Sequence, residues 1–248
     1  MHNISLSAEK IAEIGNFPIS NSLLTTWIVM AILIIIAFIS TKNINIIPSG
    51  LQNIIEGLLE ALYGLIESVA GDKAKRFFPL VVTIFLFVIT SNWLGLVPGA
   101  NALGIFHDIE GHQEFTPLFR SPSADLNTTL ALALIAVGAI QLFGILSVGL
   151  PAHIGKYINL KSPIYFFVGI LELISEVSRI ISFSFRLFGN VFAGEVLLLV
   201  IAFLIPVIIP MPFLIFELFV GFIQALVFAM LTLVFLNVAT IKHEEMHD

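Results

Sequence analysis

The sequence contains no cysteine, and only 11% of its 248 residues carry a charge. Without cysteine, the chain forms no disulfide and no thiolate metal site. The formal net charge is −6, and the 11 basic residues do not cluster as a nucleic-acid-binding patch would. Phosphate-binding loops, nucleophile motifs and metal-ligand clusters are also missing. We therefore expect no nucleic-acid partner, no cofactor and no nucleotide chemistry in this chain.

Hydrophobic residues are abundant instead, at 58% of the chain, with 23 Phe and 17 Gly. A soluble domain of this length has no core large enough to bury so much apolar surface. A β-barrel would show short segments of alternating polarity rather than long apolar runs. The composition predicts an all-α polytopic membrane protein, with residues 1–248 forming a single integral membrane domain.

A membrane-spanning helix needs about 20 apolar residues. The segments that meet this length are 22–40, 78–97, 126–150, 164–205 and 213–239. The first is too long for a signal peptide and has no basic region before it, so we expect it to be retained. Residues 49–70 differ, because Glu56, Glu60 and Glu67 share one face of an otherwise apolar helix. This pattern predicts an amphipathic helix at the membrane surface.

Basic residues indicate the orientation. Segments 41–77 and 151–163 hold Lys and Arg, whereas the polar connection 98–125 holds Arg120 with several acidic residues. The positive-inside rule places the two basic segments in the cytoplasm. The N-terminus is then outside and the C-terminus is cytoplasmic.

Segment 164–205 is twice as long as a span requires. Pro163 and Pro206 bracket it, and no turn signal interrupts it. As one helix it would be about 63 Å long. A helix of that length fits in a bilayer only when steeply tilted, and lipid alone does not favour such a tilt. We therefore expect a protein partner to cover it.

Polar residues of this helix form a stripe. At about 100° per residue, they fall within about 80° of each other, and Glu195 lies apart at about 140° from Glu172. We call them the polar stripe: Glu172, Glu176, Arg179, Arg186 and Asn190. Because ionisable residues are costly inside a bilayer, the stripe predicts a wet cavity or a charged partner. A structural alternative is an ion pair between Glu176 and Arg179.

Arg186 has no such alternative. No carboxylate of the chain lies one helical turn from it, at positions 182, 183, 189 or 190. Its counter-charge is therefore expected on another protein.

A second group of polar residues surrounds the outer side. Glu217 and Gln224 are seven residues apart, on one face of the last helix. Acidic and amide side chains could together line an aqueous route from outside to mid-membrane. They are Glu195, Glu217, Asn92, Asp125 and Asn127. Asn92 and Asn127 could equally serve as helix-packing hydrogen bonds or caps.

Several of these segments resemble a known family. "RLFGNVFAGE", the later "FIQALVFAMLTLVFL" and "PSADLNTTLALAL" are similar to subunit a of F-type ATP synthases. The similarity in motif runs from about residue 77 onward, and the earlier residues match in layout. Two positions depart from the pattern of some members: Glu217 stands where they have His, and Gly95 where they have Asp.

The resemblance implies a stator subunit of the proton-translocating Fo sector. Two long tilted helices would lie against a rotating ring of c subunits, with b-type peripheral stalk subunits and the rest of the F1Fo complex as further partners. Arg186 would face the ring carboxylates and separate two half-channels. Asn190, Glu195 and Gln224 match family positions. The location implied is the inner (plasma) membrane of a bacterial-type cell.

The inner half-channel is assigned from position. Pro163, preceded by Lys156 and Lys161, marks the inner end of the long helix, so Glu172 and Glu176 would serve proton exit on that side. His243 and His247 have no evident third ligand, so no metal site is expected. Three alternatives stay open: a transporter or channel acting alone, a structural scaffold, and a Na⁺-coupled form of the same subunit.

Overall fold

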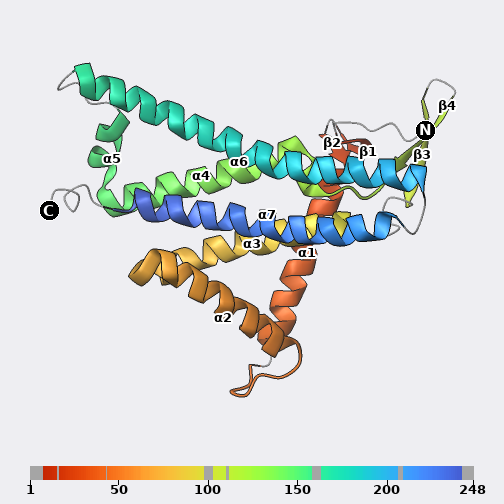
Figure 1. The fold of residues 1–248 in the computed structure, drawn as a ribbon, viewed down its shortest axis with the longest axis horizontal. Coiled ribbons are helices and arrows are strands. Elements are labelled where there is room, and N and C mark those ends of the chain that lie inside the picture. The colour runs from red at the N-terminus through yellow and green to blue at the C-terminus, as the bar shows by residue number, and fades with distance from the viewer. Residues whose placement is uncertain are drawn as a thin grey trace.

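The structure, a computed structural model, describes residues 8–15, 17–42, 44–97, 103–109, 112–157, 163–205 and 209–241. Helices dominate it (Figure 1). They are α1 (Asn21–Lys42), α2 (Leu51–Ala70), α3 (Ala74–Gly95), α4 (Leu126–Val148), α5 (Leu150–Tyr157), α6 (Pro163–Leu204) and α7 (Pro210–Ala239), with short 3-10 turns at Gly71–Lys73 and Pro122–Ala124.

The predicted class, an all-α polytopic membrane protein, is confirmed. Five stretches of the described chain are helical, long and apolar enough to cross a membrane: Asn21–Lys42, Leu51–Gly95, Leu126–Val148, Pro163–Leu204 and Pro210–Ala239. The second of them joins α2 to α3. That each stretch crosses the bilayer, and that residues 1–248 form one membrane domain, stay predictions.

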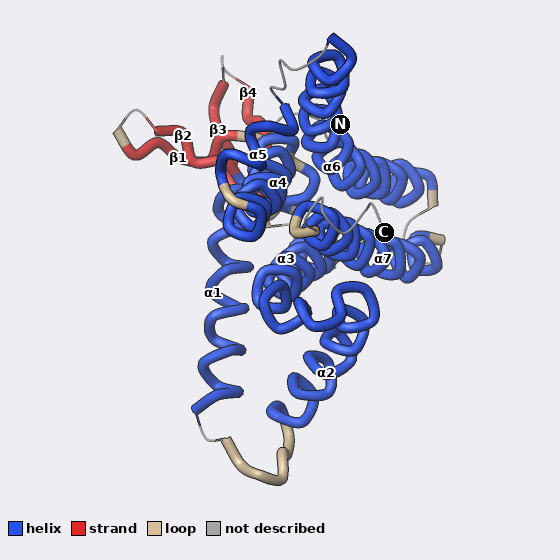
Figure 2. Tube along the Cα trace, turned by 90° about the vertical axis from the view of Figure 1, so that its left-hand side faces the viewer, coloured by secondary structure: helices blue, strands red, loops and turns tan. Residues whose placement is uncertain are grey.

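The helices α3, α4, α6 and α7 run alongside one another, and α1 crosses them at a steep angle (Figures 1 and 2). Any inclination of α6 and α7 in the bilayer is therefore shared by α3 and α4. The core between them includes several aromatic pairs. Phe77 of α3 packs edge-on against Phe143 of α4, and Phe183 of α6 packs against Phe228 of α7.

Helix α6 is continuous over 42 residues, without a hairpin turn. Pro163 stands at its first position, where proline's missing N–H costs no helical hydrogen bond. Its buried side consists largely of Phe183, Ser184, Leu187, Phe188 and Val191. These residues face the neighbouring helices, so the other side of α6 is left uncovered.

Helix α2 has the predicted amphipathic character. Glu56, Glu60 and Glu67 are exposed, while Leu62 and Ile66 pack into the core. Gly71 ends the helix with φ of +54°, which an L side chain rarely adopts. The chain turns there and enters α3. The position of α2 at a membrane surface stays a prediction.

Two antiparallel hairpins were not predicted. Strand β1 (Lys10–Ile14) pairs with β2 (Phe17–Ser20), and β3 (Gly104–Ile109) pairs with β4 (His112–Pro117). The second hairpin lies in the polar connection 98–125. Its strands are short, and β-formers such as Ile105 and Phe115 are mixed with charged residues. Such a weak alternation is hard to recognise from sequence.

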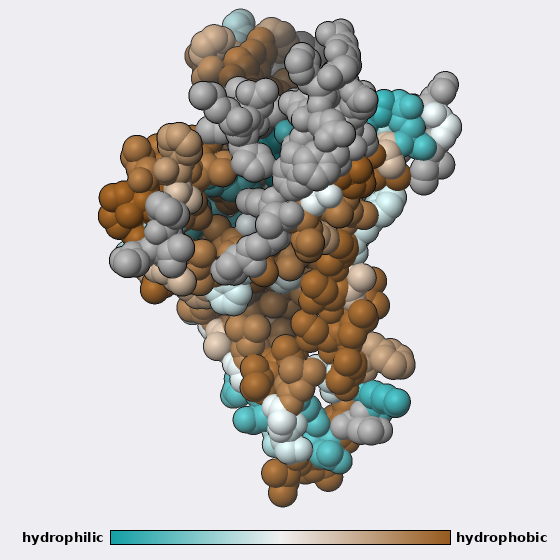
Figure 3. All heavy atoms as spheres, turned by 90° about the vertical axis from the view of Figure 1, so that its right-hand side faces the viewer, coloured by the Kyte–Doolittle hydropathy of each residue, from teal (hydrophilic) through white to brown (hydrophobic). Residues whose placement is uncertain are grey.

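The surface is strongly apolar. Figure 3 shows hydrophobic atoms over most of one face, with hydrophilic atoms gathered mainly toward its ends. Exposed large side chains lie on α1, α6 and α7, among them Phe38, Phe167, Phe203, Phe216 and Phe219. A soluble monomer rarely exposes such a continuous apolar surface, so lipid or a partner protein covers it.

Candidate ion-translocation site

Arg186 lies on the uncovered side of α6. The residue is exposed, and its guanidinium donates a hydrogen bond to Ser182 Oγ at 3.2 Å. Within the described chain it has no carboxylate partner. Its neighbours Ile181 and Phe185 are exposed and apolar. Helix α6 thus presents a charged group in the middle of an apolar surface.

One turn further along, α6 is joined to α7 by side-chain amides. Asn190 Nδ2 donates to Gln224 Oε1 at 2.7 Å. Gln224 is buried, and its own Nε2 has no hydrogen-bond partner in the described chain. The structure therefore joins Asn190 of the polar stripe to Gln224 of the last helix, two residues that match family positions.

Glu217 of α7 lies directly against α6. Only 7% of this residue is exposed. Its carboxylate packs against Gly194, and a methyl group at that position would overlap both carboxylate oxygens. Because Gly194 has no side chain, the Glu217 carboxylate of α7 can pack directly against α6 at this position.

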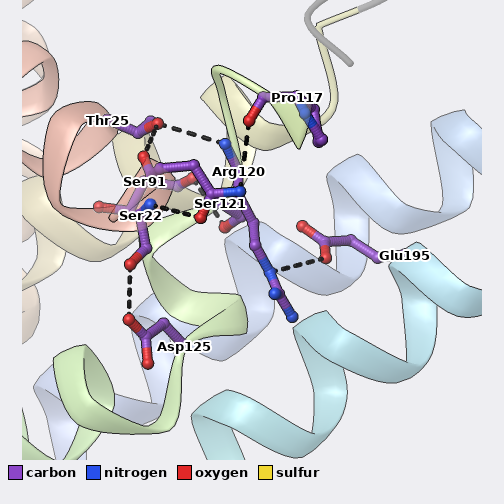
Figure 4. Close-up of polar contacts among 9 residues, drawn as sticks. Ser22, Thr25, Ser91, Pro117, Arg120, Ser121, Asp125 and Glu195 are labelled. Atoms are coloured by element: carbon purple, nitrogen blue, oxygen red, sulfur yellow. Dashed lines mark hydrogen bonds and ion pairs between the residues drawn. The ribbon is translucent and has the colours of Figure 1, made fainter. Parts of the chain in front are cut away.

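Glu195 follows in the chain but points to another side of α6. Its Oε2 lies 4.0 Å from Arg120 Nε, and both side chains are largely shielded (Figure 4). The Ser121 backbone also faces this carboxylate. Glu195 and Glu217 thus come from the neighbouring helices α6 and α7, and Arg120 is the cation beside Glu195. The sequence reasoning did not assign a role to Arg120.

The other residues predicted for the outer route are more separate. Asn92 of α3 is buried, and its Nδ2 donates to the Gly221 carbonyl of α7 at 3.0 Å. Asn92 thus forms a hydrogen bond between two packed helices, one of the two roles considered for it from the sequence. Its Oδ1 has no partner in the described chain.

Asp125 and Asn127 lie at the start of α4. Asp125 caps that helix by accepting from the Asn127 backbone N–H at 3.0 Å, and it accepts a second bond from Ser22 Oγ at 2.5 Å. Both residues line a cleft of about 520 Å³ between the first hairpin, α1 and α4. The cap is thus Asp125, not Asn127, and its described side-chain contacts are with α1 and its own helix rather than with Glu195 or Glu217.

On the N-terminal half of α6, Glu176 and Arg179 form an ion pair with oxygen and nitrogen 2.7 Å apart. The Arg179 guanidinium also stacks over the Phe235 ring of α7, 3.9 Å from its centre. Glu172 is exposed. The polar stripe is therefore divided, with Arg179 and Asn190 turned toward α7 and Glu172 and Arg186 left uncovered.

A polar cluster beside this ion pair was missed. His153 Nε2 lies 2.7 Å from Gln141 Oε1, and the Tyr157 hydroxyl donates to the same oxygen at 3.0 Å. Desolvation by burial, followed by Lys156, lowers the pKa of His153, whereas burial and then Glu176 raise the pKa of Tyr157. The sequence did not indicate this cluster, because α5 is short and mixes polar and apolar residues. His243 and His247 lie outside the described residues.

The comparisons with known proteins agree with the resemblance. The family described as "ATP synthase A chain" matches residues 23–237. The chain belongs to this family. The match begins in α1, well before the motifs that first suggested it, and reaches the last turn of α7.

Three relatives, each named "ATP synthase subunit a", are similar over nearly the whole chain. The protein of Gloeobacter violaceus is 39% identical over 91% of this chain and 86% of its own length. That of Geobacter sulfurreducens is 33% identical, covering 92% and 89%. That of Moorella thermoacetica is 32% identical, covering 92% and 94%. Membership of the ATP synthase A chain family thus applies to the chain as a whole.

Proposed function

We propose that this chain is the stator subunit of the Fo sector of an ATP synthase. It would conduct protons to and from the carboxylates of a rotating c-subunit ring through two offset half-channels. Arg186 separates these half-channels. The proposal rests chiefly on Arg186, which is exposed on the apolar side of α6 and has no carboxylate partner in the described chain.

The mechanism follows from the cost of charge in lipid. A ring carboxylate that crosses the lipid must be neutral, because its ionised form costs at least ~2.5–3.5 kcal/mol there. Beside the Arg186 guanidinium the ionised form is favoured. An arriving protonated site therefore loses its proton on one side of Arg186 and takes up another on the far side.

Arg186 also blocks a leak. Its guanidinium stays protonated in proteins, so it cannot relay a proton between the half-channels. A membrane potential of 100 mV supplies about 2.3 kcal/mol for each charge that crosses, and this free energy biases the direction of rotation.

The remaining residues take roles by position. Glu195 and Glu217, from facing helices near the β3–β4 side of the molecule, would serve the outer half-channel, with Asn92, Asp125 and Asn127 toward its mouth. Glu172 and Glu176 would serve the inner one. Glu176 is held by Arg179 at 2.7 Å, so Glu172, which is exposed, is the better exit group.

Partners and location follow from the same proposal. The c ring would cover the exposed side of α6, and b-type stalk subunits would hold the chain within the F1Fo complex. The chain would sit in the inner membrane of a bacterial-type cell, with its N-terminus outside and its C-terminus in the cytoplasm. Nucleotide chemistry would belong to other subunits.

The test is Arg186→Ala in the assembled complex. We expect ATP-driven proton pumping into inverted membrane vesicles to be abolished, while the chain still inserts, because removing a mid-membrane charge eases insertion. Arg186→Lys should also fail, since an ammonium reaches less far and its pKa falls when it is buried. Pumping at a near wild-type rate in Arg186→Ala would contradict the proposal.

The same vesicles test the alternatives. Pumping that requires Na⁺ would identify the Na⁺-coupled form of the subunit. Ion flux by the purified chain without its ring would instead favour a transporter or channel acting alone.

A further inference from the structure

Residues 117–125, from the last residue of β4 to the residue before α4, form an anchored segment. Its contacts reach α1 and α3 (Figure 4). They are Asn21 Nδ2 to the Pro117 carbonyl at 3.3 Å, Arg120 N–H to Thr25 Oγ1 at 3.3 Å, Ser121 Oγ to the Ser91 carbonyl at 3.1 Å, and Ser22 Oγ to Asp125 at 2.5 Å. The backbone on both sides of Arg120 is thus fixed to two helices.

Gly95 allows this close approach. A methyl group at position 95, at the end of α3, would overlap the Ser121 side chain and crowd its backbone. Because glycine leaves that space free, the segment settles directly onto α3. Ser121 is buried as a result. Arg120 therefore starts from a rigid base.

From this base the Arg120 side chain reaches α6. Its Nε lies 4.0 Å from Glu195 Oε2, and its guanidinium carbon lies 6.0 Å from the centre of the Phe192 ring, one turn earlier. The exposed fractions of the Arg120 and Glu195 side chains are 11% and 20%. This shielding from solvent makes the pair stronger than an ion pair on an open surface.

Two charged groups face Glu195 from the elements packed around it: Arg120 from the anchored segment and Glu217 from α7. Without Arg120, Glu195 would keep the repulsion from Glu217 and lose the cation beside it. Arg120 thus supplies the cation that offsets the repulsion of Glu195 by Glu217.

We propose that Arg120 is a positioning residue that holds the Glu195 carboxylate at the outer end of α6. This inference rests on the proposed function for its consequence in proton transport. Its geometry is independent of that function, so the first test measures geometry alone.

The first test uses the absence of cysteine. In a Glu195→Cys variant of the assembled complex, two small thiol reagents are compared, one bearing a sulfonate and one a quaternary ammonium. A guanidinium a few Å from the thiol attracts the anionic reagent. We expect Arg120→Gln to lower the anionic-to-cationic rate ratio by about tenfold, and Arg120→Lys to change it much less. Lys10→Gln, which removes an exposed cation paired with Glu13, is the control and should leave the ratio unchanged.

The second test measures proton pumping with Glu195 intact. Arg120→Lys should stay within about twofold of wild type, whereas Arg120→Gln should lower the rate by about fivefold. Rescue by the charge-retaining variant separates positioning of a carboxylate from simple packing.

The results decide between distinct failures. A reagent ratio that Arg120→Gln leaves unchanged, or a thiol at position 195 that neither reagent reaches, would overturn the inference. So would failure of both Arg120→Gln and Arg120→Met to assemble, because Arg120 would then serve folding. Loss of pumping in Arg186→Ala together with an unchanged ratio would leave the proposed function standing and reject Arg120 alone.

Discussion

The lack of a side chain at Gly194 allows the Glu217 carboxylate to pack against α6. Glu217 is buried, and its described surroundings offer it no hydrogen bond or ion pair from a side chain. Its carboxylate occupies the space that a side chain at position 194 would take. The contact between α6 and α7 at this level is therefore built for a carboxylate, and it depends on glycine.

We expect Gly194→Ala to displace Glu217 and lower proton pumping several-fold, because the overlap cannot be relieved without moving the carboxylate or separating the helices. The measurement is pumping by membrane vesicles with equal amounts of assembled complex. Gly138→Ala in α4 is the matched control, since a methyl group there meets nothing within 4 Å.

A double variant sharpens this prediction. In a Glu217→Ala background, Gly194→Ala should cost little more, because residues in contact are coupled. An equal loss in both backgrounds would show that Gly194 serves helix packing rather than the placement of Glu217.

The roles of single residues could be predicted from the sequence only where the interacting residues are close together in the chain. The uncompensated charge of Arg186 was readable from four positions around it, and the pairing of Glu176 with Arg179 from their spacing of one turn. Arg120 could not be found in this way, because its partner Glu195 is far away in sequence. Only the packing of the anchored segment onto α3 brings them together.

At the scale of elements, α5 connects the C-terminal end of α4 to the N-terminal end of α6. Gln141 of α4 accepts hydrogen bonds from His153 and Tyr157 of α5. Gly169 of α6 lies under the Tyr157 carbonyl, where a methyl group would overlap that carbonyl. Helix α5 is thus fastened on both sides, close to Glu172 and Glu176.

This fastening should weaken in acid. Burial, with Lys156 nearby, lowers the pKa of His153 below its usual value, and Glu176 offsets this only in part. When α5 detaches, His153 recovers a normal pKa of about 6.5 and binds a proton more readily. Stability from docked, neutral His153 is therefore present above that pH and is lost as the pH falls below it.

Hydrogen exchange of the α5 amides, corrected for intrinsic rates, measures the effect. Protection should drop between about pH 7.5 and about pH 5.5 in the wild type. His153→Gln keeps a neutral polar side chain and should remove most of this pH dependence. The same drop in that variant would assign the acid sensitivity to another group.

The elements themselves were predictable to different degrees. Long apolar runs gave the helices of the core with ends that shift by a few residues, because burial of apolar surface dominates there. Helix α5 was not predicted, since eight residues that include Pro151 and Gly155 carry little helical signal. Gly149, with φ of +90°, separates it from α4.

For the whole molecule, the relation of α1 to the other helices gives the proposed tilt a geometric basis. Helix α1 has the length of a single span, and α3, α4, α6 and α7 run across it (Figure 1). If α1 stands upright in the bilayer, the other four lie well inclined. The length of segment 164–205 predicted such an inclination for α6, and the family resemblance implied it for α7 as well. Neither gave a sign that α3 and α4 share it.

The proposed orientation predicts sidedness along α6. Glu172 and Glu195 are about 35 Å apart along the helix axis. In Glu172→Cys, a water-soluble thiol reagent should react from the cytoplasmic side, and in Glu195→Cys it should react from the outside. Right-side-out and inverted vesicles make the comparison, and the cysteine-free parent chain is the control.

Opposite results would have distinct meanings. Labelling of Glu172→Cys from the outside alone would invert the proposed topology. Protection of both positions from both sides would mean that the polar stripe is dry and serves packing.

Arg186 finally bears on how the chain exists before it is assembled. A guanidinium exposed on an apolar helix disfavours membrane residence by at least ~2.5–3.5 kcal/mol, roughly a hundredfold in an equilibrium constant, until a carboxylate reaches it. A newly made chain carries this disadvantage throughout the interval between its synthesis and its docking. The residue proposed to separate the half-channels in the finished complex therefore also makes the solitary chain a poor resident of the bilayer. We expect the lifetime of the chain to depend on the supply of the partner that brings this carboxylate.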